Sequence, residues 1–194
     1  MGLPVRVDRV LKWGMFRAQI RSDVELRLLE ERHADTIFAL VDQDREYLRE
    51  WLPWVDATRE VDDTLTFIRS TREQFASNQG FAAGIWRQDR YIGGIGTHKI
   101  DWLHRKVEIG YWIGRLYQGN GIVTDACRAL ITHSLSELEL NRVEIHCAAG
   151  NVRSRALAER LGFELDGTLR EAHFLHGKYH DLLIFAVLKR DWKA

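Results

Sequence analysis

Residues 117–126 read Tyr-Gln-Gly-Asn-Gly-Ile-Val-Thr-Asp-Ala and lie between a strand-like run and a helix-like run. Gly119 and Gly121 allow the backbone to turn tightly and to approach a ligand closely. The first N–H groups of the following helix have no partner within the helix, so they are directed into this turn. Such a turn can bind a phosphate or pyrophosphate group. A strand-to-helix turn that holds no ligand explains the same residues equally well.

Two better-known phosphate-binding patterns do not fit this stretch. The glycines are not followed by Gly-Lys-Ser or Gly-Lys-Thr, which excludes a P-loop, and the spacing Gly-x-Gly-x-x-Gly of a dinucleotide-binding turn is missing. The turn therefore belongs to neither of these two classes of phosphate-binding turn.

The pattern on both sides of the turn predicts an α+β (mixed α/β) fold in one domain. Its order is β-αα-βββ-α-β-α-ββ, with about seven strands in a central sheet and about four helices around it. Strands are expected near residues 24–29, 81–87, 91–101, 105–114, 142–148, 163–172 and 179–189. Helical segments are expected near residues 32–43, 44–52, 62–78 (capped by Asp62 or Asp63), 121–138 and 152–161.

Length and composition restrict the class of protein. The chain has 194 residues, and 45% of them are hydrophobic, which is enough for one folded core. The 28 basic and 28 acidic residues cancel, so the basic excess of a general nucleic-acid binder is missing. The apolar runs are shorter than 18 residues, which argues against a transmembrane helix. Residues 1–14 differ from the rest and are expected to form an N-terminal arm, with the domain spanning residues 15–194.

Cysteine and histidine positions indicate neither a disulfide framework nor a metal site. Cys127 and Cys147 both lie in apolar stretches, and the eight histidines are scattered without zinc-ligand spacing. His176 and His180 are four residues apart, but Gly177 between them indicates a hairpin. Free buried thiols favour a reducing, cytoplasmic setting.

The glycine turn resembles the Gln/Arg-x-x-Gly-x-Gly/Ala signature of the GNAT superfamily of N-acetyltransferases. Gln118, Gly121 and Val123 take the signature positions, with valine in place of the usual Gly or Ala. Residues 108–113, Glu-Ile-Gly-Tyr-Trp-Ile, resemble the family strand before the signature, whose backbone pairs with the pantetheine arm of acetyl-CoA. Asn151-Val152-Arg153-Ser154 and the later Leu-Gly-Phe at 161–163 resemble the Asn-x-x-Ser helix of the family.

The resemblance implies a mostly antiparallel sheet whose strands four and five splay apart, and acetyl-CoA as the cosubstrate. The pyrophosphate would lie on the backbone amides of residues 119–124. The residues implied to bind acetyl-CoA are Ile109, Tyr111, Trp112, Ile113, Gln118, Gly119, Asn120, Gly121, Ile122, Val123, Thr124, Asn151 and Ser154.

Two further stretches are similar to the bacterial Rim-type branch, which acetylates the N-terminal amines of ribosomal proteins. They are Trp51-Leu52-Pro53-Trp54 and the end of the chain from Gly177 onward. The resemblance covers about residues 15–193. The proline-broken aromatic segment predicts an acceptor entrance or a dimer contact, and simple core packing explains it equally well. Trp51, Trp54 and Tyr179 are the candidate acceptor-binding residues, and a homodimer stays open.

Acetyl transfer from a thioester requires a neutral amine. At pH 7, deprotonating an α-amine costs about 1–1.4 kcal/mol, whereas deprotonating a lysine costs about 4.6 kcal/mol. An α-amine therefore needs less help from a general base. We expect direct attack by the amine, because neither cysteine has a visible activating neighbour in the sequence.

Glu108 and His146 are the candidate general bases, because both lie near the place where the family's strands splay. His146 lies five residues before Asn151, where some Rim-type enzymes carry a catalytic glutamate, and a histidine can titrate near neutrality. An ion-paired carboxylate and an ordinary strand histidine are the alternative explanations.

The candidate proton donor to the departing thiolate is Ser154. Many superfamily members use a tyrosine seven residues after the asparagine, but this chain has Ala158 there. A first-turn hydroxyl bonded to the backbone explains Ser154 as well, and Tyr117 and Tyr179 remain open as substitutes.

Three functions from two classes follow from these residues. The first is acetyl-CoA-dependent acetylation of a protein N-terminus, without direct contact to nucleic acid or membrane. The second is acetylation of a small amine such as a polyamine, an amino acid or an aminoglycoside. The third is a non-catalytic acyl-CoA-binding module, for which the valine at 123 and the alanine at 158 leave room.

Overall fold

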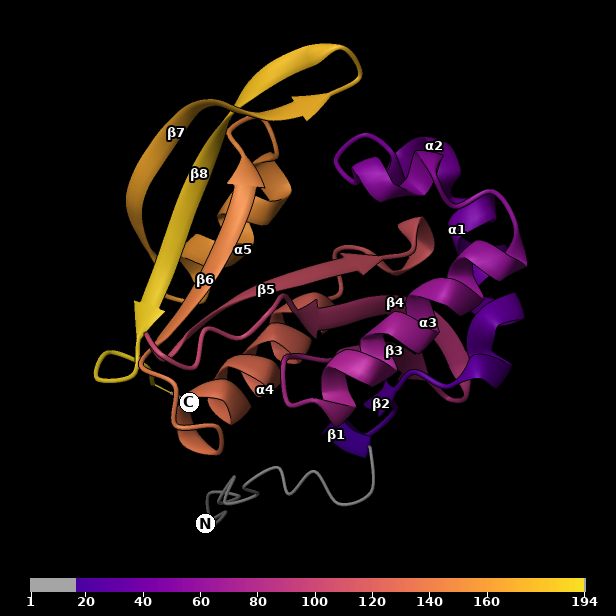
Figure 1. The fold of residues 1–194 in the computed structure, drawn as a ribbon, viewed down its shortest axis with the longest axis horizontal. Helices are drawn as coiled ribbons and strands as arrows, with labels where there is room; N and C mark the ends of the chain where they lie inside the picture. Colours follow the sequence, from indigo (N-terminus) through magenta and orange to yellow (C-terminus); the bar gives the residue numbers. More distant parts are fainter. Residues whose placement is uncertain (1–16, 194) are drawn as a thin grey trace, which may run out of the picture.

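A computed structural model describes residues 17–193, and the expected arm 1–14 lies outside them. One eight-stranded sheet runs through the molecule in the order β1-β2-β3-β4-β5-β6-β8-β7 (Figure 1). Its strands are β1 (Arg17–Arg21), β2 (Val24–Leu28), β3 (Ala82–Arg87), β4 (Arg90–Thr97), β5 (Lys106–Ile113), β6 (Arg142–Ala148), β7 (Glu164–Leu175) and β8 (Lys178–Leu188). Every neighbouring pair is antiparallel except β5 and β6, which are parallel. The expected mostly antiparallel mixed sheet is confirmed.

Five α-helices cover the two faces of the first half of the sheet and one face of the second half (Figure 1). They are α1 (Ala34–Gln43), α2 (Arg45–Leu48), α3 (Val61–Ala76), α4 (Ile122–Ser136) and α5 (Val152–Arg160). Residues of α1 and α3 form one apolar cluster with Trp86, Tyr91 and Trp112. Residues of α4 and α5 form the larger core on the opposite face.

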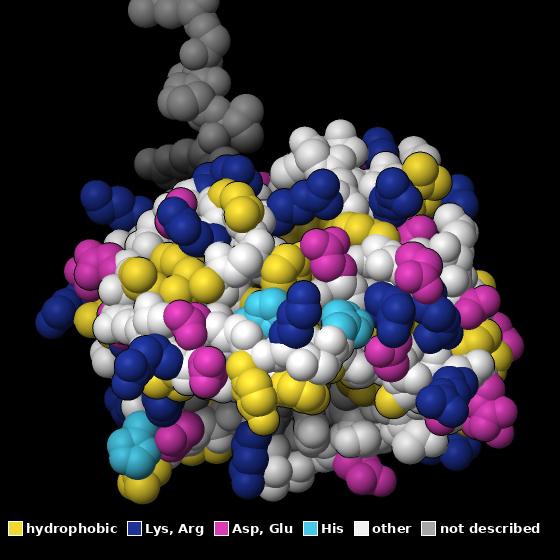
Figure 2. Space-filling view, turned by 90° about the horizontal axis from the view of Figure 1, so that it is seen from above, with side chains coloured by type: hydrophobic (Ala, Val, Ile, Leu, Met, Phe, Trp, Pro, Cys, Tyr) yellow, Lys and Arg dark blue, Asp and Glu magenta, His cyan; other side chains and the backbone are white. Residues whose placement is uncertain are grey.

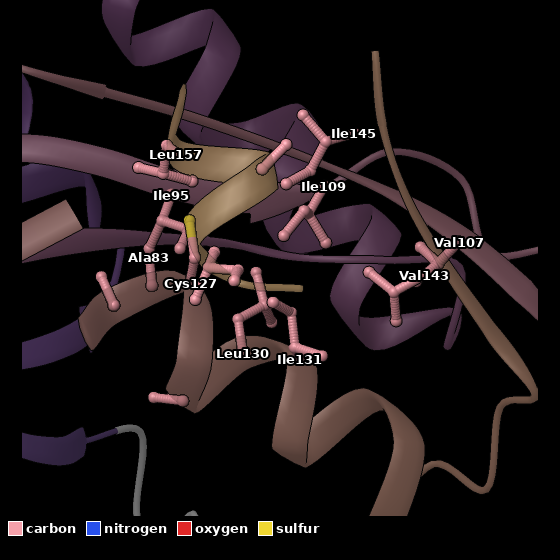
Figure 3. Packing of buried hydrophobic residues seen from close by; sticks show 14 of the residues in the cluster. Ala83, Ile95, Val107, Ile109, Cys127, Leu130, Ile131, Val143, Ile145 and Leu157 are labelled. Carbon is pink, nitrogen blue, oxygen red and sulfur yellow. The ribbon is translucent and has the colours of Figure 1, made fainter. Parts of the chain in front are cut away.

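The larger core follows from alternation along the strands. Ile109 of β5 and Ile145 of β6 each follow directly after the in-register pair Glu108 and Glu144, so both point to the same face, into the larger core. They meet Cys127, Leu130 and Ile131 on one stripe of α4 (Figure 3). The expected apolar stripe of the 121–138 helix is therefore confirmed, and Cys127 is fully buried in it.

The sheet opens between β5 and β6, the fourth and fifth of the seven strands expected from the sequence. Lys106 is in register with Arg142 and Glu108 with Glu144, and the pairing covers this short stretch. Beyond it the two strands diverge toward the top of Figure 1. We call this separation of the β5 and β6 backbones the slit.

Two expectations about elements were wrong. Strand β1, which pairs with β2 from Arg17 onward, was not predicted from the sequence. The cap of α3 was expected at Asp62 or Asp63, but the cap is Glu60. Asp63 instead accepts a hydrogen bond from the Glu60 backbone N–H as the return half of a capping box.

None of the helices within residues 17–193 is both long enough and apolar enough to cross a bilayer.

Candidate active site

The glycine turn has the backbone that its sequence predicts. Gly119 has φ of 74° and Gly121 has φ of 71°, both in the left-handed region that favours glycine. Gly121 is the N-cap of α4, a helix of 15 residues. A Cβ atom at Gly119 would meet nothing within 4 Å, so the turn is open on that side. The unpaired amides at the start of α4 therefore face accessible space, as an anion site requires.

Three arginines from two elements, α5 and β1, surround this turn. Arg153 of α5 donates a hydrogen bond to the Gln118 side chain. Arg160 donates to Thr124 Oγ1 at 3.4 Å, and Arg21 pairs with Asp125 at 2.5 Å. These cations add to the positive end of the helix and suit a ligand that carries several phosphate charges.

Val123, which departs from the usual signature, lies half-buried and packs against the larger core. Its side chain therefore points away from the turn. The substitution changes packing beneath α4 and leaves the backbone donors of the turn in place.

The edge of β5 offers backbone groups to the slit. The Glu108 carbonyl accepts from His98 N–H at 2.9 Å, and Gly114 N–H donates to the Ile92 carbonyl at 2.8 Å, so both face β4. Because the direction of backbone groups alternates along a strand, those of Ile109, Tyr111 and Ile113 face β6. The pairing of β5 with β6 ends at Glu108, so these backbone groups lie beyond the paired stretch. The backbone groups of Trp112 instead face β4, because Trp112 lies at an even spacing from Glu108 and Gly114 along the strand.

Glu108 and His146 meet across the slit. His146 Nδ1 lies 3.2 Å from Glu108 Oε2, although the two residues belong to different strands. The Glu108 side chain is about one third exposed and that of His146 is less so, so the pair can be reached from solvent. The two candidate bases are thus one pair. The second ring nitrogen, Nε2, lies 2.8 Å from Glu144 Oε2, a contact that the sequence analysis did not identify.

Ser154 lies on the other face of the sheet, beside a phenol. Its Oγ is 2.8 Å from the hydroxyl of Tyr111, and its N–H donates to Asn151 Oδ1 at 3.1 Å. Asn151 is therefore the N-cap of α5, as the simpler explanation predicts. Burial raises the pKa of Tyr111, and the hydrogen bond from Ser154 only partly opposes this. Sequence reasoning found Tyr111 through its backbone and missed its hydroxyl, although strand alternation places it on the α5 face.

The two alternative tyrosines have other contacts. Tyr117 packs under the guanidinium of Arg90 at 6.0 Å from its ring centre. Tyr179 is largely exposed on the β7–β8 hairpin and its ring packs against Phe174. Tyr111 is therefore the phenol that the structure places beside Ser154.

The aromatic segment contacts both halves of the sheet. Trp54 packs against Trp112 of β5, with ring centres 5.8 Å apart. Trp51 packs edge-on against His180 of β8, and its ring lies 2.9 Å from where a Cβ on Gly150 would be. Pro53 begins a short 3₁₀ helix, Pro53–Asp56, rather than a regular helix. The segment thus bridges the open end of the splay.

The same end of the molecule carries histidines. His176 Nε2 contacts the Arg49 carbonyl at 2.6 Å, which ties the β7–β8 hairpin to the end of α2. Figure 2 views this end and shows histidine side chains in the middle of the face, among Lys, Arg and acidic side chains. The expected hairpin at 176–180 is confirmed.

Both cysteines are buried, and neither is a low-pKa thiol. Burial raises the pKa of Cys127. Burial also raises the pKa of Cys147, and a hydrogen bond with Ser154 only partly opposes this effect. His146 lies on the opposite face of β6 from Cys147, as alternation predicts. A Cys–His nucleophile is therefore not formed within this strand.

Comparison with known proteins identifies the family. The model of the acetyltransferase (GNAT) domain family matches residues 23–164, and the chain belongs to this family. It is an acetyl-CoA-dependent acetyltransferase, which the fold, the turn and the open strand edge accommodate.

Several relatives are named as ribosomal acetyltransferases. "Putative ribosomal N-acetyltransferase YdaF" of Bacillus subtilis (strain 168) is 39% identical over 181 residues, which is 93% of this chain and 99% of that protein. The ribosomal-protein-serine acetyltransferase of Escherichia coli (strain K12) is 31% identical over 87% of this chain and 94% of its own. The structure of RimL, a ribosomal L7/L12 alpha-N-protein acetyltransferase in complex with coenzyme A, superposes with a TM-score of 0.86. It is 26% identical and covers 89% of this chain and 97% of that one.

Residues 17–193 contain no group of three or more His, Cys, Asp and Glu side chains that could hold a metal ion.

Proposed function

We propose that this enzyme transfers the acetyl group of acetyl-CoA to the N-terminal α-amine of a ribosomal protein. The observation that carries the proposal is the slit between β5 and β6. The Glu108–His146 pair lies on one face of the sheet at this slit, and the Ser154–Tyr111 pair lies on the other face. A base and a hydroxyl on opposite sides of one opening suit a reaction in which one proton is removed from an amine and another is given to a thiolate.

The proposed binding mode of acetyl-CoA uses backbone groups. Its pyrophosphate would lie on the amides of residues 119–124, where the left-handed glycines leave the start of α4 open. Its pantetheine arm would follow the edge of β5 at Ile109, Tyr111 and Ile113. Arg153 and Arg160 would stand near its phosphates.

The proposed reaction is direct attack. Acetyl-CoA supplies the acetyl group as a thioester. The amine nitrogen forms a bond to the acetyl carbon, and the bond between that carbon and sulfur breaks. Glu108 and His146 accept the proton of the ammonium, and Ser154 supports protonation of the sulfur. The raised pKa of Cys127 and Cys147 favours this route over a covalent acetyl-enzyme.

Ser154→Ala should lower kcat by about 100-fold while changing the Kd for CoA by less, because a proton donor acts in the transition state and contributes little to binding. Steady-state kinetics and calorimetry measure the two quantities. Ser70→Ala, an exposed serine on α3, is the matched control and should change neither. Equal losses in kcat and CoA affinity would leave Ser154 with only a binding role.

Trp54→Ala should raise the KM for the acceptor by about tenfold and leave the KM for acetyl-CoA unchanged, because the ring bridges to Trp112 at the acceptor end of the slit. Trp102→Ala is the control, since Trp102 is as exposed as Trp54 (40% against 38%) and lies elsewhere. A fall in thermal stability with no change in acceptor KM would show that Trp54 contributes only to core packing.

The experiment for the acceptor class is thiol release from acetyl-CoA with a panel of amines. We expect turnover with peptides that carry a free ribosomal-protein N-terminus and none with the same peptides blocked at the α-amine. Turnover confined to spermidine, amino acids or aminoglycosides would support a small-amine acetyltransferase instead. CoA binding without turnover on any amine would support the acyl-CoA-binding module.

A ribosomal acceptor implies work in the cytoplasm, where such proteins are made. Cytoplasmic localisation is therefore part of this proposal, and the homodimer stays a prediction.

A further inference from the structure

Glu144 is an almost fully buried carboxylate next to the proposed proton-accepting pair. It is 8% exposed and lies in register with Glu108 on the neighbouring strand. Its Oε2 contacts His146 Nε2 at 2.8 Å, while the other ring nitrogen faces Glu108 at 3.2 Å. One imidazole thus lies between two carboxylates, one buried and one at the slit.

We propose that Glu144 is a positioning residue for the acetyl transfer: it binds the Nε2–H of His146 and so turns the Nδ1 lone pair toward Glu108. The proposal rests on the function proposed above. Neither the glycine signature nor the aromatic segment points to this residue.

The cations around Glu144 keep it ionised. Arg142 Nε lies 2.6 Å from Oε1, and Lys106 Nζ lies 3.6 Å from the same oxygen. Burial alone would raise the pKa of Glu144, but hydrogen bonds from Arg142 and His146 outweigh it and hold the pKa below its usual value. Because Oε1 is taken by the two cations, Oε2 is the oxygen left for the imidazole.

An ionised carboxylate at 2.8 Å selects the tautomer of the ring. Nε2 must carry a proton to bond to Glu144, so in the neutral ring Nδ1 carries a lone pair. An unprotonated Nδ1 and a carboxylate oxygen of Glu108 are both hydrogen-bond acceptors. They form a hydrogen bond only when a proton is added between them. The 3.2 Å contact is therefore a place where one proton is held after it leaves the amine.

Further charged groups contact both ends of the series of contacts that runs from Arg142 through Glu144 and His146 to Glu108. Arg142 also pairs with Asp166 of β7 at 2.6 Å, which anchors the guanidinium across the second half of the sheet. At the other end, His98 Nε2 is 3.6 Å from Glu108 Oε1, and His98 is largely exposed. The buried end is thus held rigidly, and the exposed end is open to solvent for release of the proton.

The kinetic test is Glu144→Gln, which keeps the size of the side chain and removes its charge. An anion beside His146 stabilises the protonated Glu108–His146 pair, so removing it weakens the base. We expect kcat to fall about tenfold. The KM for acetyl-CoA should not change. Glu31→Gln, which breaks an exposed pair with Arg69, is the control and should shift nothing. A kcat within twofold of wild type would overturn the proposal.

A spectroscopic test needs no turnover. Long-range ¹⁵N–¹H correlation spectra of the unliganded enzyme report which imidazole nitrogen carries the proton. We expect the Nε2–H tautomer for His146 in the neutral ring, and its loss in Glu144→Gln. The Nδ1–H tautomer in the wild-type enzyme would overturn the proposal even if the variant failed to fold.

A double-mutant cycle separates this inference from the proposed function. If Glu144 acts through His146, Glu144→Gln should cost no further activity in a His146→Ala background. Additive losses would contradict positioning. If the wild-type enzyme acetylated no peptide, the function proposed above would fail, while the tautomer would still test the role of Glu144.

Discussion

Gly121→Val should weaken CoA binding by at least about 100-fold, or about 2.7 kcal/mol, and leave the protein folded. Gly121 has φ of 71°, which a β-branched residue adopts only under strain. A Cβ atom there would also lie 3.0 Å from the Arg21 guanidinium. The substitution therefore turns the first amides of α4 away from the proposed pyrophosphate site. Isothermal titration calorimetry with CoA measures the loss.

Gly162→Val is the matched control for backbone strain. Gly162 also has positive φ, 80°, and ends α5 with nothing near its Cβ position. It should lower stability by a similar amount and leave CoA affinity within about threefold of wild type. If both variants lost affinity equally, the effect would come from global destabilisation, and the anion site at the start of α4 would be rejected.

Glu108→Gln should lower kcat on an N-terminal peptide by about 100- to 1,000-fold, because the amide that replaces the carboxylate beside His146 cannot take up a proton. The affinity for CoA should stay unchanged, since Glu108 lies away from the glycine turn. Single-turnover kinetics with a peptide acceptor measure the chemical step directly.

His146→Ala and the double variant Glu108→Gln/His146→Ala complete this experiment. Because the two side chains act as one pair, the double variant should be little slower than the slower single variant. Glu25→Gln, a glutamate bonded to Arg27 on β2, is the control. Full kcat in both single variants would show that solvent or backbone takes the proton, and would remove both residues from the mechanism.

Most of the fold could be predicted because its strands and helices are long and regular. Helix α4 shows its apolar stripe plainly, and the glycines at 119 and 121 fix where it begins. Strand β1 was missed because it is short and only Ala18 within it is buried, so alternation gives little signal over five residues. The cap of α3 was misplaced because glutamate is an uncommon cap beside the aspartates that follow it.

The glycine turn could be located from the sequence because its residues are consecutive. The rest of the site depends on contacts between distant residues. Tyr111 and Ser154 meet 43 positions apart, and Glu108 meets His146 only because of the register of the one parallel strand pair. The sequence analysis placed Glu108 and His146 near the splay, but it could not show that they touch. Glu144 carried no motif, so its position beside His146 follows from the structure alone.

The most direct test of the central claim is to locate the acetyl group by mass spectrometry after incubating the enzyme with acetyl-CoA and unacetylated ribosomal proteins. Tandem spectra distinguish an acetylated N-terminal α-amine from an acetylated lysine side chain. The account predicts acetylation at an N-terminus, lost in Glu108→Gln and retained in Glu25→Gln. Acetyl groups found only on lysine side chains, or ribosomal proteins left unmodified while a small amine is acetylated, would contradict it.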